Sequence, residues 1–437
     1  LAKEAPAAGV AAIPPAASGG PVTALVGATV HTVTGPAIPG ATVLLEGGKI
    51  AALGADLVLP EGAERIDLSG LHLYPGFIVA NSTLGLVEVS SVRGTMDANE
   101  TGEVNPNARA QVALNPSSEL IPVTRANGVL TAQTALTGGI LTGTSVIWNL
   151  DGWTWEEMTL VPAAALFLRW PAMVPEESRW GGPPPPEEEV KKRREKQLKT
   201  LRESFDAAKA YWKARRAMAE GGPRHETDVR WEAMIPALER KVPVFIMADE
   251  ITQIGAALDF ARDEELRVVI VGGRDAPLCA ERLVEQEVPV VLSGATGMPR
   301  RSWEPYDAAF TAARRLHEAG VRFCISTPGF TANTRNLPYE AAMAAAFGLP
   351  PDEALRAITL YPAQILGLGD RLGSIEPGKD ANLIATDGDP LEIRTRVLRA
   401  WIAGRPMEMT SRHTALYEKW RNRPRAEGGE TRLRPAP

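Results

Sequence analysis

The stretch that decides the fold lies near the beginning of the chain, where residues 75–85 read Pro75-Gly76-Phe77-Ile78-Val79-Ala80-Asn81-Ser82-Thr83-Leu84-Gly85. Its apolar half belongs to the predicted β-strand Leu73–Val79, which runs directly into polar side chains. A second stretch, residues 372–390, reads Leu372-Gly373-Ser374-Ile375-Glu376-Pro377-Gly378-Lys379-Asp380-Ala381-Asn382-Leu383-Ile384-Ala385-Thr386-Asp387-Gly388-Asp389-Pro390. Its glycines and prolines predict turns that lead into one short strand.

The two ends of the chain have the same β-rich character. Residues 22–70 and residues 371–408 alternate short apolar runs with turns, and neither piece is long enough to bury a core alone. We therefore expect both pieces to pair into one small β-sandwich domain. The predicted strands of this domain are Thr23–Val33, Ala41–Glu46, Lys49–Leu53, Asn382–Thr386 and Val397–Ala403.

Between these ends, residues 71–370 alternate apolar runs with helical periods. The further strand candidates are Val129–Thr134, Ser145–Asn149, Val242–Met247, Arg267–Val271, Val288–Leu292 and Arg322–Ser326. The helix candidates include Thr252–Arg262, Ala276–Gln286, Tyr306–Ala319 and Pro338–Phe347. The repeated order of strand, loop and helix predicts an α/β fold with a parallel sheet.

A charged helical insertion over about residues 181–220 interrupts this order. Prolines precede Glu187–Glu189, and acidic residues favour the N-terminal end of a helix because of its dipole. Apolar side chains then recur at three- and four-residue spacing and form one stripe: Leu198, Leu201, Phe205, Ala208 and Trp212. This stripe either packs on the barrel of the same chain or contacts a second subunit.

Composition excludes two classes of function. Of the 437 residues, 44% are hydrophobic and 23% are charged, as is typical of a globular protein. The net charge is −6, so the chain lacks the excess of basic residues that nucleic-acid binding requires. No apolar run approaches the roughly 20 residues that a transmembrane helix needs. We expect neither a nucleic-acid partner nor a transmembrane segment.

The outermost residues predict flexible or peripheral segments. Residues 1–21 are rich in alanine, proline and glycine and read as a flexible leader. Because the chain starts at Leu1, a processed periplasmic or secreted protein is expected, with a transit peptide or an artificial start as alternatives. Residues 409–437 predict a last helix over 411–423, followed by a polar tail. Three side chains of this helix are expected to face inward: Leu416, Tyr417 and Trp420.

Together, the two quoted stretches resemble the two ends of an amidohydrolase-superfamily enzyme of the imidazolonepropionase-like kind. The resemblance covers about residues 22–408, and Leu355–Leu366 resembles the family's late helices. It implies a (β/α)8 TIM-like barrel over residues 71–370 and a small β domain built from both chain ends. It also implies hydrolysis of a carbon–nitrogen bond at the C-terminal mouth of the barrel, where zinc or another divalent metal polarises a carbonyl and activates water.

The metal-ligand positions of that family hold other residue types in this sequence. The family's first segment normally runs Pro-Gly-Phe-Ile-Asp-x-His-x-His, whereas this chain has Asn81 and Thr83 at the two histidine positions. Met247 stands where a later histidine is usual, and Thr327 stands where many members carry an aspartate as general base. Amide, hydroxyl and thioether groups bind zinc poorly compared with imidazole, so we expect no catalytic residue, no metal and no cofactor. These four residues and Arg274 are predicted to line the pocket at the mouth.

Carboxylates and histidines elsewhere leave one alternative open. Acidic residues follow two of the predicted strands: Asp97, Glu100, Glu103, Asp249 and Glu250. They could form a paired-carboxylate site or a calcium site. Alternatively, they could form a solvated rim of the barrel. None of the histidines is expected at the mouth: His31, His72, His225, His317 and His413.

Three functions therefore remain open. The first is a catalytically inactive pseudoenzyme that serves as a structural or accessory subunit, in an oligomer or beside a protein partner such as an active amidohydrolase relative. The second is a divergent hydrolase acting on an amide, a cyclic amide or a peptide. The third is a binder of a small ligand in the pocket at the mouth. Fold alone does not decide among them.

Overall fold

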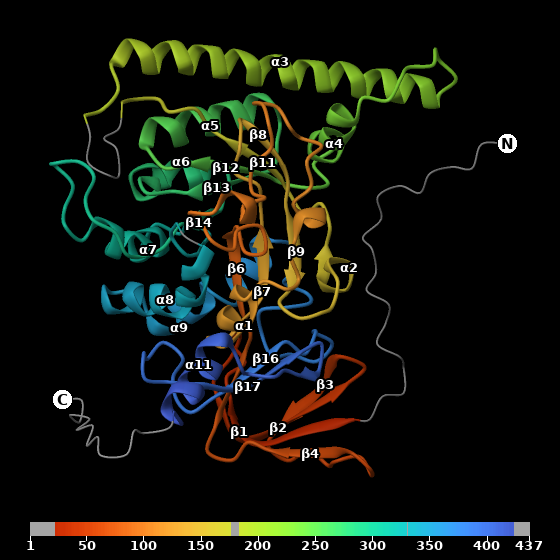
Figure 1. Cartoon of the computed structure of the whole chain (residues 1–437), viewed down its shortest axis with the longest axis vertical. Coiled ribbons are helices and arrows are strands. Elements are labelled where there is room, and N and C mark those ends of the chain that lie inside the picture. Colours follow the sequence, from red (N-terminus) through yellow and green to blue (C-terminus); the bar gives the residue numbers. More distant parts are fainter. Residues whose placement is uncertain (1–21, 176–182, 330, 424–437) are drawn as a thin grey trace.

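The computed structural model describes residues 22–175, 183–329 and 331–423. The predicted leader and the polar tail lie outside these residues. The chain is an α/β protein in which a small β domain, a set of barrel strands and one long helix follow each other along the long axis (Figure 1). None of the described helices is long and apolar enough to cross a bilayer.

The small domain consists of one sheet rather than two facing sheets. Its strand order is β18-β17-β16-β5-β1-β2-β3, with β4 paired to β1. The two chain ends meet where β16 runs antiparallel to β5, with Leu383 opposite Pro75. The sheet folds around one cluster that includes Leu25, Val43 and Trp401. The strand bounds are Thr23–Val30 (β1), Ile38–Glu46 (β2), Lys49–Gly54 (β3), Glu64–Asp67 (β4), His72–Pro75 (β5), Leu383–Thr386 (β16), Val397–Ile402 (β17) and Arg405–Pro406 (β18).

The predicted strand Leu73–Val79 is two strands in the structure. Its first part is β5 of the small sheet, and its second part begins the barrel strand β6 (Phe77–Ser82). Gly76 lies between them, where a Cβ atom would approach Leu130 Cδ1 to 2.5 Å. Glycine is therefore required here because the chain passes close to a neighbouring strand, and not only because it turns.

The barrel strands form two further sheets. One has the order β10-β9-β7-β6 and the other β15-β14-β13-β12-β11-β8. Strands β11 to β15 pair in parallel, as do β6 and β7. The remaining strand bounds are Val129–Thr134 (β7), Leu141–Thr144 (β8), Val146–Asn149 (β9), Thr159–Val161 (β10), Leu166–Arg169 (β11), Val244–Ala248 (β12), Val268–Gly272 (β13), Val290–Leu292 (β14) and Phe323–Ile325 (β15).

The regular alternation of strand and helix breaks after β7. The chain returns through residues 135–140 into β8, which runs antiparallel to β11, and then into β9, which runs antiparallel to β7. Strands β8 and β9 flank Ser145, so one chain segment passes from one sheet to the other. A hairpin thus replaces one strand–helix unit of a regular (β/α)8 barrel.

Backbone contacts bridge β15 and β6, the outer strands of the two sheets. No ladder pairs these two strands among the described residues. Instead, the amide of Ile78 donates to the carbonyl of Ile358, and the amide of Ile325 donates to the carbonyl of Ala357, both at 2.9 Å. The predicted helix Leu355–Leu366 is interrupted at this point and forms two short helices, because the carbonyls of its middle residues accept hydrogen bonds from β6 and β15.

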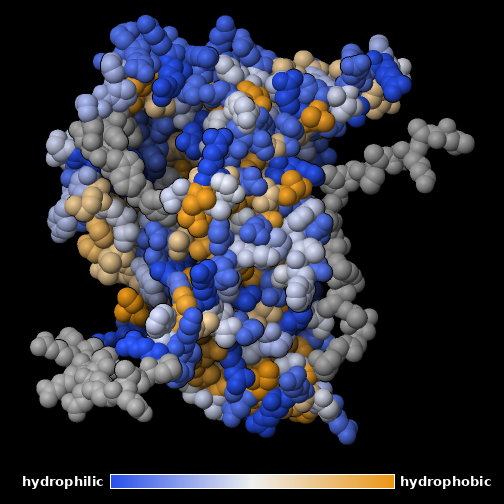
Figure 2. All heavy atoms as spheres, viewed as in Figure 1, coloured by the Kyte–Doolittle hydropathy of each residue, from blue (hydrophilic) through white to orange (hydrophobic). Residues whose placement is uncertain are grey.

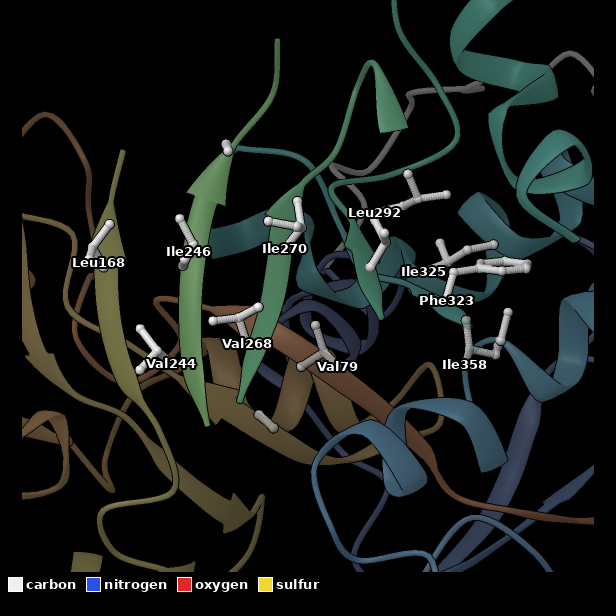
Figure 3. Packing of buried hydrophobic residues seen from close by; sticks show 14 of the residues in the cluster. Val79, Leu168, Val244, Ile246, Val268, Ile270, Leu292, Phe323, Ile325 and Ile358 are labelled. Carbon is white, nitrogen blue, oxygen red and sulfur yellow. The ribbon is translucent and has the colours of Figure 1, made fainter. Parts of the chain in front are cut away.

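Side chains fill the space that the barrel strands enclose. Phe167 and Phe245 stack with ring centroids 5.1 Å apart, and they pack with Ala80, Val271 and Cys324 in one buried cluster. Alternate residues of the same strands point outward to the helices and form the larger core (Figure 3). The enclosed space is a packed core rather than a pore.

The helices surround these strands. Their bounds are Leu120–Arg125 (α1), Trp155–Met158 (α2), Glu187–Ala219 (α3), Val229–Leu238 (α4), Ile251–Asp263 (α5), Ala280–Glu285 (α6), Ala308–Glu318 (α7), Leu337–Ala346 (α8), Pro351–Arg356 (α9), Leu360–Ile365 (α10) and Arg412–Arg421 (α11). Short 3-10 turns occupy Arg93–Thr95, Ala110–Ala113, Ala276–Cys279 and Thr331–Asn336.

Helix α3 lies across the top of the molecule in Figure 1 and packs on the same chain. Leu201, Phe205 and Ala208 of the predicted stripe are buried. The Phe205 ring meets Phe260 of α5 edge-on at 5.1 Å, and Lys209 pairs with Glu264 at 2.7 Å. The surface around α3 is mainly hydrophilic (Figure 2).

The inward orientation predicted for the last helix is wrong. In α11, Leu416 is 41% exposed, Tyr417 63% and Trp420 59%, and the helix has no buried residue. The helix starts at a capping box formed by Ser411 and Thr414. Its aromatic rings lie against basic side chains of the same helix rather than against a core. The apolar spacing therefore marks a surface face.

Candidate functional site

A cavity of about 130 Å³ opens where the strands β6, β7, β12, β14 and β15 end. Asn81, Thr83, Met247 and Thr327, all predicted at the pocket, lie together in its lining. Hydroxyl groups dominate this lining, and it carries no ionisable side chain. The lining residues are Asn81, Ser82, Thr83, Ala135, Leu136, Thr137, Met247, Ser293, Thr327, Gly329, Thr331 and Thr334.

The end of β6 places Asn81 and Thr83 at the cavity. The pairing of β6 with β7 changes register between Val79 and Ser82, so the strand bulges as it reaches the mouth. The Thr83 hydroxyl lies 2.6 Å from the Thr331 hydroxyl, and Ser326 Oγ donates to the carbonyl of Asn81 at 2.8 Å. Polar groups at the mouth thus bind one another and the backbone.

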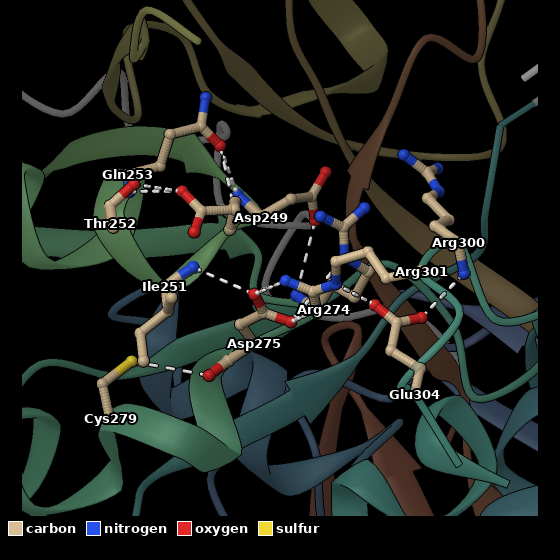
Figure 4. Close-up of polar contacts among 11 residues, drawn as sticks. Asp249, Ile251, Thr252, Gln253, Arg274, Asp275, Cys279, Arg300, Arg301 and Glu304 are labelled. Carbon is tan, nitrogen blue, oxygen red and sulfur yellow. Dashed lines mark hydrogen bonds and ion pairs between the residues drawn. The ribbon is translucent and has the colours of Figure 1, made fainter. Parts of the chain in front are cut away.

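Ion pairs join three loops beside the cavity (Figure 4). Asp275, on the loop after β13, is 3% exposed and accepts a hydrogen bond from the Ile251 amide at 3.0 Å. Arg301, on the loop after β14, donates to the same carboxylate at 2.8 Å. The Asp275 amide donates to the carbonyl of Asp249, on the loop after β12, at 2.8 Å. The hydrogen bonds that Arg301 donates to Asp275 raise the pKa of its guanidinium, which also pairs with Glu304.

Arg274 does not line the cavity, contrary to the prediction. Its backbone amide approaches Asp249 Oδ1 at 3.4 Å, and its Nε lies 3.8 Å from Asp275 Oδ1. Gly272 and Gly273 both have positive φ angles, of 103° and 63°, and they turn the chain away after β13. Arg274 therefore belongs to the ion-pair network beside the mouth.

The carboxylates considered for an acid–base or calcium site do not converge on the cavity. Asp97, Glu100 and Glu103 are exposed on the loop after β6, and none of them lines the cavity. Glu250 caps the N-terminus of α5, accepting a hydrogen bond from the Gln253 amide at 3.2 Å. These positions form a solvated rim and a helix cap.

The histidines lie elsewhere in the fold, and none of them lines the cavity at the mouth. His31 and His72 form a hydrogen-bonded pair in the small domain, with Nε2 and Nδ1 3.0 Å apart. Burial and the neighbouring His72 lower the pKa of His31. His225 follows α3, His317 lies in α7 near Glu353, and His413 lies in α11.

Two residues near the mouth were not found from the sequence. Glu340 of α8 is 7% exposed and accepts hydrogen bonds from the Ala295 amide at 2.7 Å and from Thr296 Oγ1 at 3.0 Å; burial raises its pKa. It fixes the loop that follows Ser293. Gln133 of β7 is fully buried, and its Oε1 has no hydrogen-bond partner among the described residues. A single sequence does not show that a glutamate in a helix will bind a distant loop, or that a glutamine in a strand will be buried with an unpaired oxygen.

The side chains at the mouth do not fit a catalytic zinc ion. Zinc sites use imidazole, thiolate or carboxylate ligands at about 2.0–2.3 Å, and this cavity offers an amide, a thioether and hydroxyls. The Thr83 hydroxyl already contacts Thr331. Within the described parts of the chain, no group of three or more histidine, cysteine, aspartate or glutamate side chains is arranged to hold a metal ion.

Comparisons with known proteins point to one family. Residues 231–419 match the model described as "Amidohydrolase family". The chain is 25% identical over 374 residues to "Amidohydrolase tasK" of Hapsidospora irregularis, covering 79% of this chain and 37% of that protein. It is 40% identical over 105 residues to an imidazolonepropionase of Syntrophobacter fumaroxidans, covering 23% of each. The matches thus span well under two thirds of these relatives' lengths.

A solved structure matches over nearly the whole chain. It is that of an amidohydrolase from Thermotoga maritima MSB8, with a TM-score of 0.79 and 28% identity. The match covers 88% of this chain and 99% of the other. The small domain and the barrel strands therefore occur together in a solved protein.

Proposed function

We propose that this chain, which belongs to the amidohydrolase superfamily, is a catalytically inactive member that serves as a structural or accessory subunit. The observation that carries the proposal is the set of side chains at the mouth. Asn81, Thr83, Met247 and Thr327 meet there as the resemblance predicts, but none of them is a strong metal ligand or a general base.

The ion-pair network supports the same proposal. In a metal-dependent barrel, ligands from several strand ends converge on one ion. In this chain, Asp275 and Arg301 join the loops that follow β13 and β14 directly. Because each charge is the other's partner in a partly buried setting, this pair supports the shape of the mouth with protein groups.

Two observations support a role beside another protein. Large apolar side chains are exposed at separate places on the described surface: Trp153 is 91% exposed, Met298 86% and Trp303 62%. Tryptophan and methionine are enriched at protein interfaces. In the tasK relative, the matched region makes up 37% of the protein, so an equivalent module is joined there to further sequence. An active amidohydrolase is the partner we favour.

A divergent hydrolase acting on a carbon–nitrogen bond is the second candidate. It is favoured by the relatives, whose names include amidohydrolase and imidazolonepropionase. Such an activity would need a general base from outside the cavity lining, because the hydroxyls in the lining are weak nucleophiles without one. Asp275 and Glu250 are committed to an ion pair and to a helix cap, so the rim would have to rearrange to supply one.

Binding of a small ligand without turnover is the third candidate. The lining of the 130 Å³ cavity has hydroxyls from Ser82, Thr137 and Ser293 and no charge, which suits a small uncharged polar molecule. This candidate is compatible with the first, since an accessory subunit can also respond to a ligand.

Metal binding and turnover test the proposal together. The purified chain is dialysed against zinc, nickel or manganese, its metal content is measured, and hydrolysis of a dipeptide, an N-formyl amine and a cyclic imide is followed. We expect far less than one metal per chain and no turnover above buffer. Near-stoichiometric metal and turnover that both disappear in Asn81→Ala would instead establish the divergent hydrolase.

A further inference from the structure

A second cavity, of about 350 Å³, separates the first half of α3 from the rim of the barrel. It shares no lining residue with the cavity at the mouth. Its size falls within the roughly 300–1,000 Å³ of small-molecule sites. The lining residues are Glu103, Ile140, Arg193, Lys196, Gln197 and Thr200. We call this cavity the α3 cleft.

One wall of the α3 cleft is a polar face of α3. Arg193, Lys196, Gln197 and Thr200 recur at three- and four-residue spacing, so they lie on one side of the helix. Among the described residues, the side chains of Lys196 and Gln197 make no hydrogen bond or ion pair with another side chain. Arg193 approaches only Glu189, at 3.8 Å on the exposed surface, where an ion pair is weak. This wall offers two cations and an amide that are available to a ligand.

The opposite wall presents a carboxylate beside an apolar side chain. Glu103 is exposed, and its side chain has no partner among the described residues, whereas Ile140 is buried. The amide of Ile140 donates to the carbonyl of Glu103 at 2.8 Å. This close approach requires Gly139, where a Cβ atom would lie 2.9 Å from the same carbonyl. The position of the acidic wall is therefore fixed by the backbone.

Packing keeps the two walls apart. Arg194, adjacent to the cleft face, donates to the carbonyl of Met173 on the loop after β11 at 2.6 Å. Leu198 packs against the main core, and Leu201 is fully buried. Because α3 is anchored on both sides of the polar face, the backbone of the helix is held at a fixed distance from the opposite wall.

We propose that the α3 cleft binds a zwitterion, namely a free amino acid or a short peptide. Its carboxylate contacts Arg193 and Lys196, its ammonium contacts Glu103, and its apolar part lies against Ile140. A simple anion would face the Glu103 carboxylate, and a simple cation would face two basic side chains. Only a ligand with both charges satisfies both walls. This site is independent of the function proposed for the mouth.

Calorimetric titration of the full chain tests this assignment. L-leucine and L-leucyl-L-leucine are the zwitterionic probes and distinguish an amino acid from a peptide, while N-acetyl-L-leucine lacks the ammonium and L-leucinamide lacks the carboxylate. We expect one zwitterionic probe to bind more tightly than either blocked compound. Glu103→Gln should weaken the zwitterion about tenfold and leave N-acetyl-L-leucine unchanged, as expected for loss of one charge-assisted contact. Lys196→Ala should weaken the zwitterion and leave L-leucinamide unchanged.

Lys192→Ala is the matched control, because Lys192 is an exposed cation of the same helix that does not line the cleft. Three results would overturn the assignment: no zwitterion binding at millimolar concentration, equal weakening by the control variant, or binding that Asn81→Ala abolishes while the cleft variants retain it. The metal content and turnover measured for the mouth do not depend on any of these results.

Discussion

Arg301 Nη1 lies 2.8 Å from Asp275 Oδ2 and joins the loop after β14 to the loop after β13 beside the barrel mouth. Asp275 is 3% exposed, and it also accepts the Ile251 amide at the start of α5. One carboxylate therefore holds a helix start and a neighbouring loop. The ion pair thus links two loops that follow neighbouring strands at this end of the barrel.

Asp275→Asn should destabilise the protein by about 2 kcal/mol, because it removes the more deeply buried of the two carboxylates that pair with the Arg301 guanidinium, which keeps Glu304. The measurement is the free energy of unfolding from urea titration. Asp263→Asn is the control: Asp263 pairs with Arg262 on the exposed surface, and the loss of such a pair costs about 0–1 kcal/mol. Equal effects of the two variants would contradict a structural role for the pair at the mouth.

Because α3 packs on α5, shortening a buried side chain of α3 should lower the free energy of unfolding strongly. Phe205→Ala removes a fully buried ring that contacts Phe260, and it should cost about 3–5 kcal/mol. Trp420→Ala, in the exposed face of α11, should change the free energy of unfolding by less than about 0.5 kcal/mol. Thermal and urea unfolding of both variants measure this contrast, and a small effect at Phe205 would show that α3 docks elsewhere.

The histidine pair of the small domain predicts a dependence of stability on pH. The pKa of His31 is lowered from 6.5 in the folded chain, so the folded state prefers the neutral ring. Its contribution to stability is complete above the unfolded pKa of 6.5 and is lost as the pH falls from there toward the folded pKa.

Urea titrations between pH 8 and pH 5 test this dependence, with the unfolding free energy of the wild type compared with that of His31→Gln. The wild type should lose more stability on acidification than the variant. His413→Gln, which changes an exposed ring, should follow the wild type. A wild type and a His31→Gln variant with parallel pH profiles would rule out the His31 contribution.

Restoring imidazole ligands should restore metal binding. The triple variant Asn81→His, Thr83→His, Met247→His places three good zinc ligands around the cavity at the mouth. We expect zinc binding at least about 100-fold tighter than that of the wild type, measured by competition with a chromogenic chelator. The matched control introduces the same residues on the surface, as Lys192→His, Lys199→His and Lys213→His. No gain over this control would show that the strand ends do not converge as the structure describes.

The residues at the mouth could be predicted because parallel strands place their C-terminal ends at one face. Four predicted residues lie at or just after the end of such a strand, and all four line the cavity: Asn81, Thr83, Met247 and Thr327. Arg274 also follows a strand, but two glycines with positive φ turn the chain before it, and the conformation of a glycine cannot be read from its neighbours. The prediction was therefore wrong for this residue.

Other differences between the predicted and the observed fold come from long-range pairing. The segments Val129–Thr134 and Ser145–Asn149 read as strands, but the sequence does not indicate that the hairpin between them replaces a helix. Ile358 lies within a helical pattern, but the helix is interrupted where Ile78 and Ile325 donate hydrogen bonds to this segment. The spacing of Leu416, Tyr417 and Trp420 predicts an amphipathic helix but not which side faces solvent. Tertiary contacts decide each of these cases.

The central claim is that the mouth of this barrel does not hold a catalytic metal. Crystals of the wild-type chain grown with zinc, measured at the zinc absorption edge, test it most directly. The account predicts no anomalous peak in the cavity lined by Asn81, Thr83, Met247 and Thr327. A strong peak within bonding distance of these side chains would contradict it.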